Sequence, residues 1–340
     1  NTKFIFCLLL TFIFLLERKT MKKYLFSFLS LTVLSVGVAY AAPNVFMVGD
    51  SNLNSQNQNI EIEHIKSFGL GVGQPLGDFE AVTEIADYHP GSKMLYSTNG
   101  YNSPATVDRY DLSDINNPTL IESVNVGTGG VTSVAIYEDL LAAAVPSASA
   151  TNNGYLKVYN IADDGALTLA KSLRVGVLPD MVTFSPDGNM ILTANEGQPN
   201  DAYTIDPEGS VSIVDISKGV ASATVTTANF RAFNSNPSSI RKSVPSATLA
   251  QEVEPEYIAV SADSKKAYVS LQENNAIAVV DLTTKKVIGM WDLGLKNYRY
   301  NCMDLSDKET NIDSSKSKRI KTKCANVMSM YQPDAIQAYE

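Results

Sequence analysis

The sequence contains a repeated unit, and a repeat limits the folds open to a chain more than any single motif does. ADYHPGSKMLYSTN at 86–99 aligns without gaps with VTFSPDGNMILTAN at 182–195, and PEYIAVSADSKKAYVS at 255–270 aligns with residues 179–194. Each copy holds a strand-like run, a turn with Pro, Gly, Asp or Ser, and a second strand-like run, which is typical of a β-hairpin. The repeat therefore predicts a row of similar β units.

A third strand is expected after each hairpin, because similar apolar segments occur there and all end in Asp or Asn followed by an aliphatic residue. These segments are 105–112, 154–161, 209–216 and 276–282. A fourth strand then runs toward a glycine, as at 120–127 and 286–294. Four strands per unit, at spacings of about 50 residues, is the pattern of propeller blades. We therefore expect an all-β fold, a β-propeller of four-stranded blades that is incomplete in this chain.

The repeats also suggest how the chain is divided. The propeller is expected at 42–294, with blades at 79–127, 129–176, 177–230 and 255–294 and a Ser-, Asn- and Pro-rich insertion at 231–254. Residues 295–329 form an irregular basic segment. PDAIQAY at 333–339 aligns with the strand that begins at Pro179, so residues 330–340 are expected to begin a fifth blade. Further blades and an anchor are expected beyond it.

The first 41 residues resemble a leader. Met21, Lys22 and Lys23 open a basic region, residues 24–38 are apolar, and Ala39-Tyr40-Ala41 has the small-x-small form that signal peptidase cleaves. We expect residues 21–41 to be a signal peptide and residues 1–20 to be an upstream segment foreign to the protein. The chain is then exported to the periplasm, the cell surface or the medium, with no transmembrane span in the mature part.

Charge narrows the range of partners. The chain has a formal net charge of −9, but residues 1–41 carry five basic residues against one acidic residue, so the remainder carries −13. Such a surface repels phosphate backbones and anionic lipid headgroups. Nucleic acid is therefore excluded as a partner.

Long motifs in the blades resemble the choice-of-anchor I family. They are PDMVTFSPDG at 179–188, ANEGQPND at 194–201, DPEGSVSIVDI at 206–216 and EPEYIAV at 254–260, followed by LQENN at 271–275. The resemblance implies a secreted or surface-tethered propeller with YVTN-type blades, similar to mesenchyme-specific cell surface glycoproteins. Some family members are described as alkaline-phosphatase-like, phytase-like or esterase-like. Residues 297–327 do not match the family's usual link between blades, which leaves the fold of that segment open.

A loop between two predicted strands collects candidate metal ligands. They are Glu196, Asp201, Asp206 and Glu208, held between prolines and glycines. A hard cation such as Ca²⁺ needs several oxygen ligands and tolerates irregular geometry. A solvated acidic turn is the other interpretation of this loop.

A second group of polar residues recurs at blade ends. These candidates for ligand binding are Asp180, Asn195, Glu256, Gln272, Glu273, Asn274 and Asp334. Asp180, Glu256 and Asp334 occupy equivalent positions of the repeat, and so do Glu196 and Gln272. These acids are therefore expected to surround one channel mouth. Capping of strand ends by hydrogen bonds to the backbone is the alternative role.

Other catalytic chemistry has little support. The chain has two histidines, His64 and His89, and neither lies in a nucleophile-elbow motif, which disfavours a serine hydrolase. Cys302 and Cys324 are the cysteines after the leader, and their pairing is open. Two functions remain: a binding or scaffold module with an unknown surface ligand, and a Ca²⁺-dependent phosphoester hydrolase acting on a phosphorylated small molecule.

Overall fold

The computed structural model describes residues 83–100, 103–235, 240–300, 302–304 and 322–339, together with β1 (Val45–Val48) and β2 (Ile60–Glu63), which pair antiparallel. The expected leader segments, 1–20 and 21–41, and His64 lie outside the described residues. Within the described part, no helix has the length and apolar character to cross a membrane.

Four antiparallel sheets of four strands each make up most of the described chain, and in each sheet the strands are neighbours in sequence order. The first contains β3 (Ala86–His89), β4 (Met94–Asn99), β5 (Ala105–Asp111) and β6 (Thr119–Gly127). The second contains β7 (Ser133–Tyr137), β8 (Leu140–Val145), β9 (Asn153–Ile161) and β10 (Leu167–Val177). The third contains β11 (Pro179–Phe184), β12 (Met190–Asn195), β13 (Ser210–Asp215) and β14 (Thr224–Asn229), with the 3-10 turn η1 (Val220–Ser222) before its last strand. The fourth contains β15 (Pro255–Val260), β16 (Lys266–Leu271), β17 (Ala276–Asp281) and β18 (Lys286–Asp292).

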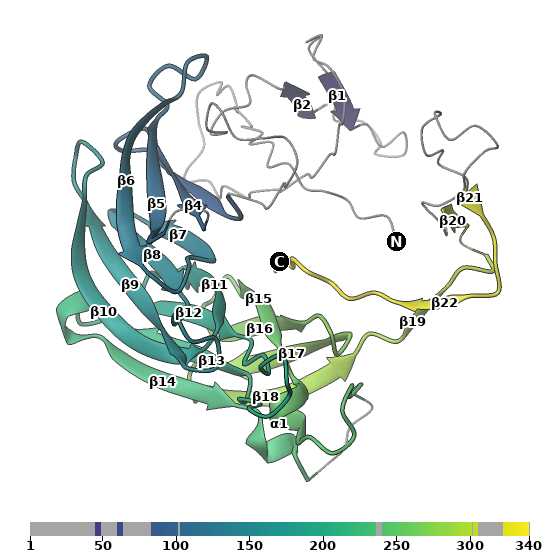
Figure 1. Cartoon of the computed structure of the whole chain (residues 1–340). Helices are drawn as coiled ribbons and strands as arrows, with labels where there is room; N and C mark the ends of the chain where they lie inside the picture. The colour runs from purple at the N-terminus through teal and green to yellow at the C-terminus, as the bar shows by residue number, and fades with distance from the viewer. Residues whose placement is uncertain are drawn as a thin grey trace.

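These sheets are propeller blades, which confirms the predicted fold class. The first strands β3, β7, β11 and β15 contact one another in that order along the inner side, and the described sheets follow one another in an arc (Figure 1). The fourth strands lie on the outer rim, where β6 and β18 are largely exposed. Strands β8, β12 and β13 are almost entirely buried because both of their faces pack against neighbouring blades or strands.

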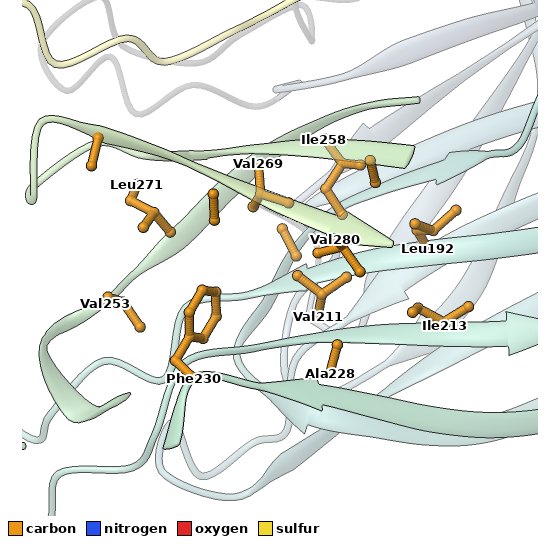
Figure 2. Packing of buried hydrophobic residues seen from close by; sticks show 14 of the residues in the cluster. Leu192, Val211, Ile213, Ala228, Phe230, Val253, Ile258, Val269, Leu271 and Val280 are labelled. Carbon is orange, nitrogen blue, oxygen red and sulfur yellow. The ribbon is translucent and has the colours of Figure 1, made fainter. Parts of the chain in front are cut away.

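The core lies between successive blades. Between the third and fourth blades, Phe230 is fully buried among aliphatic side chains from both sheets, including Val211 and Val280 (Figure 2). A second cluster joins the second and third blades through residues such as Leu156 and Ile191. Since no single sheet could bury these faces alone, neighbouring blades stabilise one another.

The recurring Asp at the end of the third strand has a structural role. The Asp111, Asp215 and Asp281 carboxylates accept backbone N–H groups of the following turn, from Ser113 at 2.7 Å, Ser217 at 3.1 Å and Thr284 at 2.7 Å. The aliphatic residue after each is buried, as are its counterparts in all four blades: Leu112, Ile161, Ile216 and Leu282. The repeated dipeptide thus fixes a turn and anchors it in the core.

One turn glycine is required by a neighbouring blade. Gly188 has φ = +70°, and a Cβ there would lie 2.3 Å from the ring of Tyr137 in the second blade. Any side chain at this position would meet both backbone strain and a steric clash. The hairpin of the third blade is therefore shaped to the surface of the second.

Two segments interrupt the blades. Residues between β14 and β15 contain η2 (Arg231–Phe233) and the short helix α1 (Leu249–Glu252). After the fourth blade, β19 (Leu295–Asn297) pairs with β22 (Met328–Met330), and β20 (Met303–Asp304) pairs with β21 (Thr322–Lys323) beside a Cys302–Cys324 disulfide. Asn275 joins the two ends of this excursion: its side chain donates to the Gly294 carbonyl at 2.7 Å and accepts from the Tyr331 N–H at 2.7 Å.

Candidate functional site

Two inner strands place carboxylates at the same end of neighbouring blades. Asp180 and Glu256 are the second residues of β11 and β15, each directly after a proline. In both strands the pairing with the next strand shifts by one residue at this point, which is a β-bulge. A bulge removes a residue from the regular ladder and redirects its side chain. The bulges therefore allow both acids to face the inner end of the blades.

Glu196 brings a third carboxylate to this end. It directly follows β12, and its N–H donates to the Leu178 carbonyl at 3.0 Å, which holds it beside the start of β11. Carboxylate oxygens of Asp180, Glu196 and Glu256 all lie within 4.8 Å of one another. Glu196 is 6% exposed, and its Oε2 has no hydrogen-bond partner among the described residues. We call Asp180, Glu196 and Glu256 the inner acidic cluster.

Burial and like charge act on this cluster together. Burial, followed by repulsion from Asp180, raises the pKa of Glu196 to about 9. The same two causes raise the pKa of Glu256 to about 8, and burial followed by repulsion from Asp334 raises the pKa of Asp180 to about 6. Three adjacent carboxylates cannot all ionise in a half-buried site without a compensating proton or cation.

Further acids surround the cluster. Glu84 lies just before β3, and partial desolvation together with Asp180 and Asp334 raises its pKa to about 7. Glu254 precedes β15, and burial together with Glu273 raises its pKa to about 7. The Glu273 Oε2 atom is buried with no hydrogen-bond partner among the described residues. The inner end of the described blades is therefore strongly acidic.

The amide side chains of Asn195 and Asn274, which the sequence suggested as ligand-binding groups, form hydrogen bonds within the fold. The Asn195 amide donates to the Ser212 hydroxyl at 3.0 Å, and its oxygen accepts from the Thr193 hydroxyl at 2.9 Å. The Asn274 amide donates to the Glu252 carbonyl at 2.8 Å and the Arg241 carbonyl at 3.0 Å. Both side chains are buried. Gln272 is half-buried, and its backbone carbonyl, rather than its amide side chain, accepts the Asn275 backbone N–H at 2.9 Å.

The loop acids Asp201, Asp206 and Glu208 do not join Glu196. Asp201 is exposed, and the Glu208 carboxylate forms a 2.6 Å ion pair with Arg231. The Asp206 carbonyl accepts from the Gln251 amide at 3.0 Å, while burial and Glu252 raise the pKa of its carboxyl. Among the described residues, the group of three close potential ligands contains Glu196 and none of the other loop acids.

Sequence reasoning missed Glu84 and left Glu254 outside the candidate residues. Glu84 precedes the first aligned repeat by two residues, as Asp180 precedes Val182, so extending the alignment would have found it. Glu254 directly precedes Pro255 and shares the run of alternating acids that begins at Glu252. In the second blade the equivalent residue is Thr132, which interrupts the acidic series.

A Ser-His-Asp arrangement occurs elsewhere, between the hairpin turn of the first blade and the hairpin turn of the second. His89 Nδ1 lies 2.8 Å from the Ser92 hydroxyl, and His89 Nε2 lies 3.2 Å from the Asp139 carboxylate. At the equivalent turns of the third and fourth blades, the Ser185 and Ser261 hydroxyls donate to Asp side chains two residues later. His89 thus occupies a turn-stabilising position, and the 82% exposure of the Asp139 side chain argues against a catalytic triad.

The family model of the choice-of-anchor I domain matches residues 84–340, which include the four blades and the inner acidic cluster. The chain belongs to the choice-of-anchor I family. This confirms the resemblance drawn from the blade motifs. A search of curated proteins found no match.

Three solved structures are similar in fold to this choice-of-anchor I chain. The β-propeller domain of Cps50 (Swd1) from Myceliophteria thermophila is 13% identical, with a TM-score of 0.43 over 64% of this chain and 57% of that one. The periplasmic gluconolactonase PpgL of Pseudomonas aeruginosa is 17% identical, with a TM-score of 0.44 over 62% and 57%. A functionally unknown protein of Desulfotomaculum acetoxidans is 18% identical, with a TM-score of 0.42 over 64% and 58%. This chain thus spans under three fifths of each of those chains.

Proposed function

We propose that this choice-of-anchor I protein is an exported or cell-surface binding module whose ligand docks at the acidic inner end of the blades. The family name refers to an anchor, which suits a protein held at a cell surface, and the basic and apolar residues of 21–41 suit export. The observation that carries the proposal is the recurrence of an acid at one position in three of the four blades, at Glu84, Asp180 and Glu256, with Asp334 beside them.

The negative charge at the inner end of the blades indicates which class of ligand can bind there. The principal electrostatic neighbours of Asp180, Glu196 and Glu256 are other carboxylates. The Arg241 guanidinium also reaches the end of β16 in the fourth blade, where it donates to the Glu273 backbone carbonyl at 2.9 Å. While the site holds no cation, a positively charged group would be attracted to this surface, whereas a phosphate ester would be repelled. We therefore favour a cationic ligand and do not propose phosphoester hydrolysis.

Binding of a lysine decapeptide, followed by surface plasmon resonance in a chelating buffer, tests the proposal. We expect the combined variant Glu84→Gln/Asp334→Asn to weaken binding about tenfold, because two attractive charges are lost at the binding surface. The control variant Asp114→Asn/Asp163→Asn has the same net charge, removed at exposed turns between third and fourth strands, and should bind like the wild type.

Equal loss of affinity in both double variants would mean that only the net charge of the protein matters, and the proposed binding face would then be wrong. Binding of a glutamate decapeptide as tight as that of the lysine peptide would also overturn it.

A further inference from the structure

The inner acidic cluster combines two properties that an ordinary surface patch of acids lacks. Its three carboxylates come from two blades and converge within 4.8 Å, and one of them, Glu196, is nine-tenths buried. We propose that Asp180, Glu196 and Glu256 bind one divalent cation of the calcium type, which joins the third blade to the fourth. This inference uses the same acidic end as the proposed function, but it does not depend on a peptide ligand.

Glu196 provides the independent sign of a missing ligand. Its Oε2 atom is buried and has no hydrogen-bond partner in the described part of the chain. Leaving a buried charged acceptor unsatisfied costs about 1–3 kcal/mol or more, so native proteins seldom do it. Glu252 shows what this fold does with another buried glutamate: its two oxygens accept the N–H groups of Ser243 and Val244. The fold satisfies Glu252 but leaves Oε2 of Glu196 without a partner among the described residues, in a carboxylate that lies within 4.8 Å of two others.

The donor set indicates a hard cation. All three ligands are carboxylate oxygens, with no His or Cys, which suits Ca²⁺, Mg²⁺ or Mn²⁺ rather than zinc or copper. Calcium binds oxygens at about 2.3–2.6 Å, so two oxygens on one ion are at most about 5 Å apart. The observed limit of 4.8 Å fits that span. Magnesium requires shorter bonds in a strict octahedron, which an irregular site on two bulged strands provides less readily.

Charge and position support a bridging role. Asp180 and Glu196 belong to the third blade, and Glu256 belongs to the fourth. An ion held by all three replaces repulsion between the blades with attraction to a shared centre. The cluster supplies three of the six to eight oxygens that calcium takes, which leaves coordination positions open to water or to a ligand at the inner end.

Calcium titration of the full chain, after removal of divalent ions with chelator, tests the site. By isothermal titration calorimetry we expect one bound Ca²⁺ per wild-type chain and a higher melting temperature in its presence. Glu196→Gln keeps the side-chain shape but removes one charge, and it should lose at least about tenfold in calcium affinity. Glu208→Gln, the same exchange in the ion pair with Arg231, should bind calcium like the wild type.

Folding is followed separately, because each variant is also melted in chelator. There Glu196→Gln should be at least as stable as the wild type, since it relieves repulsion in the empty site. Absence of calcium binding by the wild type, or unchanged binding by Glu196→Gln, would overturn the proposal. Because the lysine peptide is tested in chelator, loss of either result leaves the other standing.

Discussion

The two ends of the same blades hold acidic residues in opposite environments. At the inner end, burial and like charge raise the pKa of Asp180, Glu196 and Glu256. At the other end, hydrogen bonds from the Ser217 side chain and backbone lower the pKa of Asp215 to about 2, and hydrogen bonds within the turn also lower that of Asp281. The turn acids are satisfied by the chain itself, whereas the inner acids need something that the chain does not provide. Unsatisfied carboxylates, rather than acidic residues in general, mark the candidate site.

The largest expected effect is a fall in stability with rising pH in chelator. A folded-state pKa above the unfolded value means that the folded state holds protons which the unfolded state has released. Below about pH 4 the carboxyls of the inner acidic cluster are protonated in the folded and in the unfolded state, so they do not reduce stability. As the pH rises toward 9, the free energy of unfolding should drop on the order of 3 kcal/mol. Urea unfolding at a series of pH values measures this drop. Glu196→Gln should flatten the curve, and a wild-type curve that is already flat would remove the contrast between the two ends.

A turn acid should behave in the opposite way. Asp215→Ala removes the acceptor for the Ser217 N–H and the partner of Lys285, whose Nζ lies 3.2 Å from the carboxylate. We expect a loss of about 1 kcal/mol at pH 7, kept small by solvent exposure. Because the pKa of Asp215 is lowered, this contribution exists at neutral pH and disappears as the pH falls through about 2. Thermal melts at pH 7 and at about pH 1.5 measure it. A variant more stable than the wild type at pH 7 would contradict the assigned role.

The smallest effect is expected at a surface ion pair. Glu208→Gln breaks the contact with Arg231, whose side chain is 69% exposed. Exposed pairs contribute little, so the free energy of unfolding should change by less than about 0.5 kcal/mol, with little dependence on pH. Chemical denaturation of the variant beside the wild type checks this. A loss as large as that of Asp215→Ala would show that the loop acids also have a structural role.

The fold was accessible from the sequence because its signals are local and repeated. The hairpin turn at Ser185 recurs at Ser261, and the Asp-aliphatic pairs recur where the third strands end. The candidate site was accessible only in part. Register indicated that Asp180, Glu256 and Asp334 are equivalent and placed Glu196 at the same channel mouth. Proximity along the chain also grouped Glu196 with Asp201, Asp206 and Glu208, and the sequence did not decide between the two groupings. Bulges redirect Asp180 and Glu256, and a single backbone hydrogen bond to Leu178 holds Glu196 beside the start of β11; no residue pattern encodes those details.

The position of Asn275 has a consequence for engineering. One amide side chain contacts both Gly294, where the chain leaves the fourth blade, and Tyr331, where it returns. A stretch whose ends are tied together in this way can change in length at small entropic cost, about 0.6 kcal/mol for each doubling. Residues 295–330 are therefore a suitable graft point for a fluorescent reporter or an affinity handle, placed where it would not disturb the packing between blades.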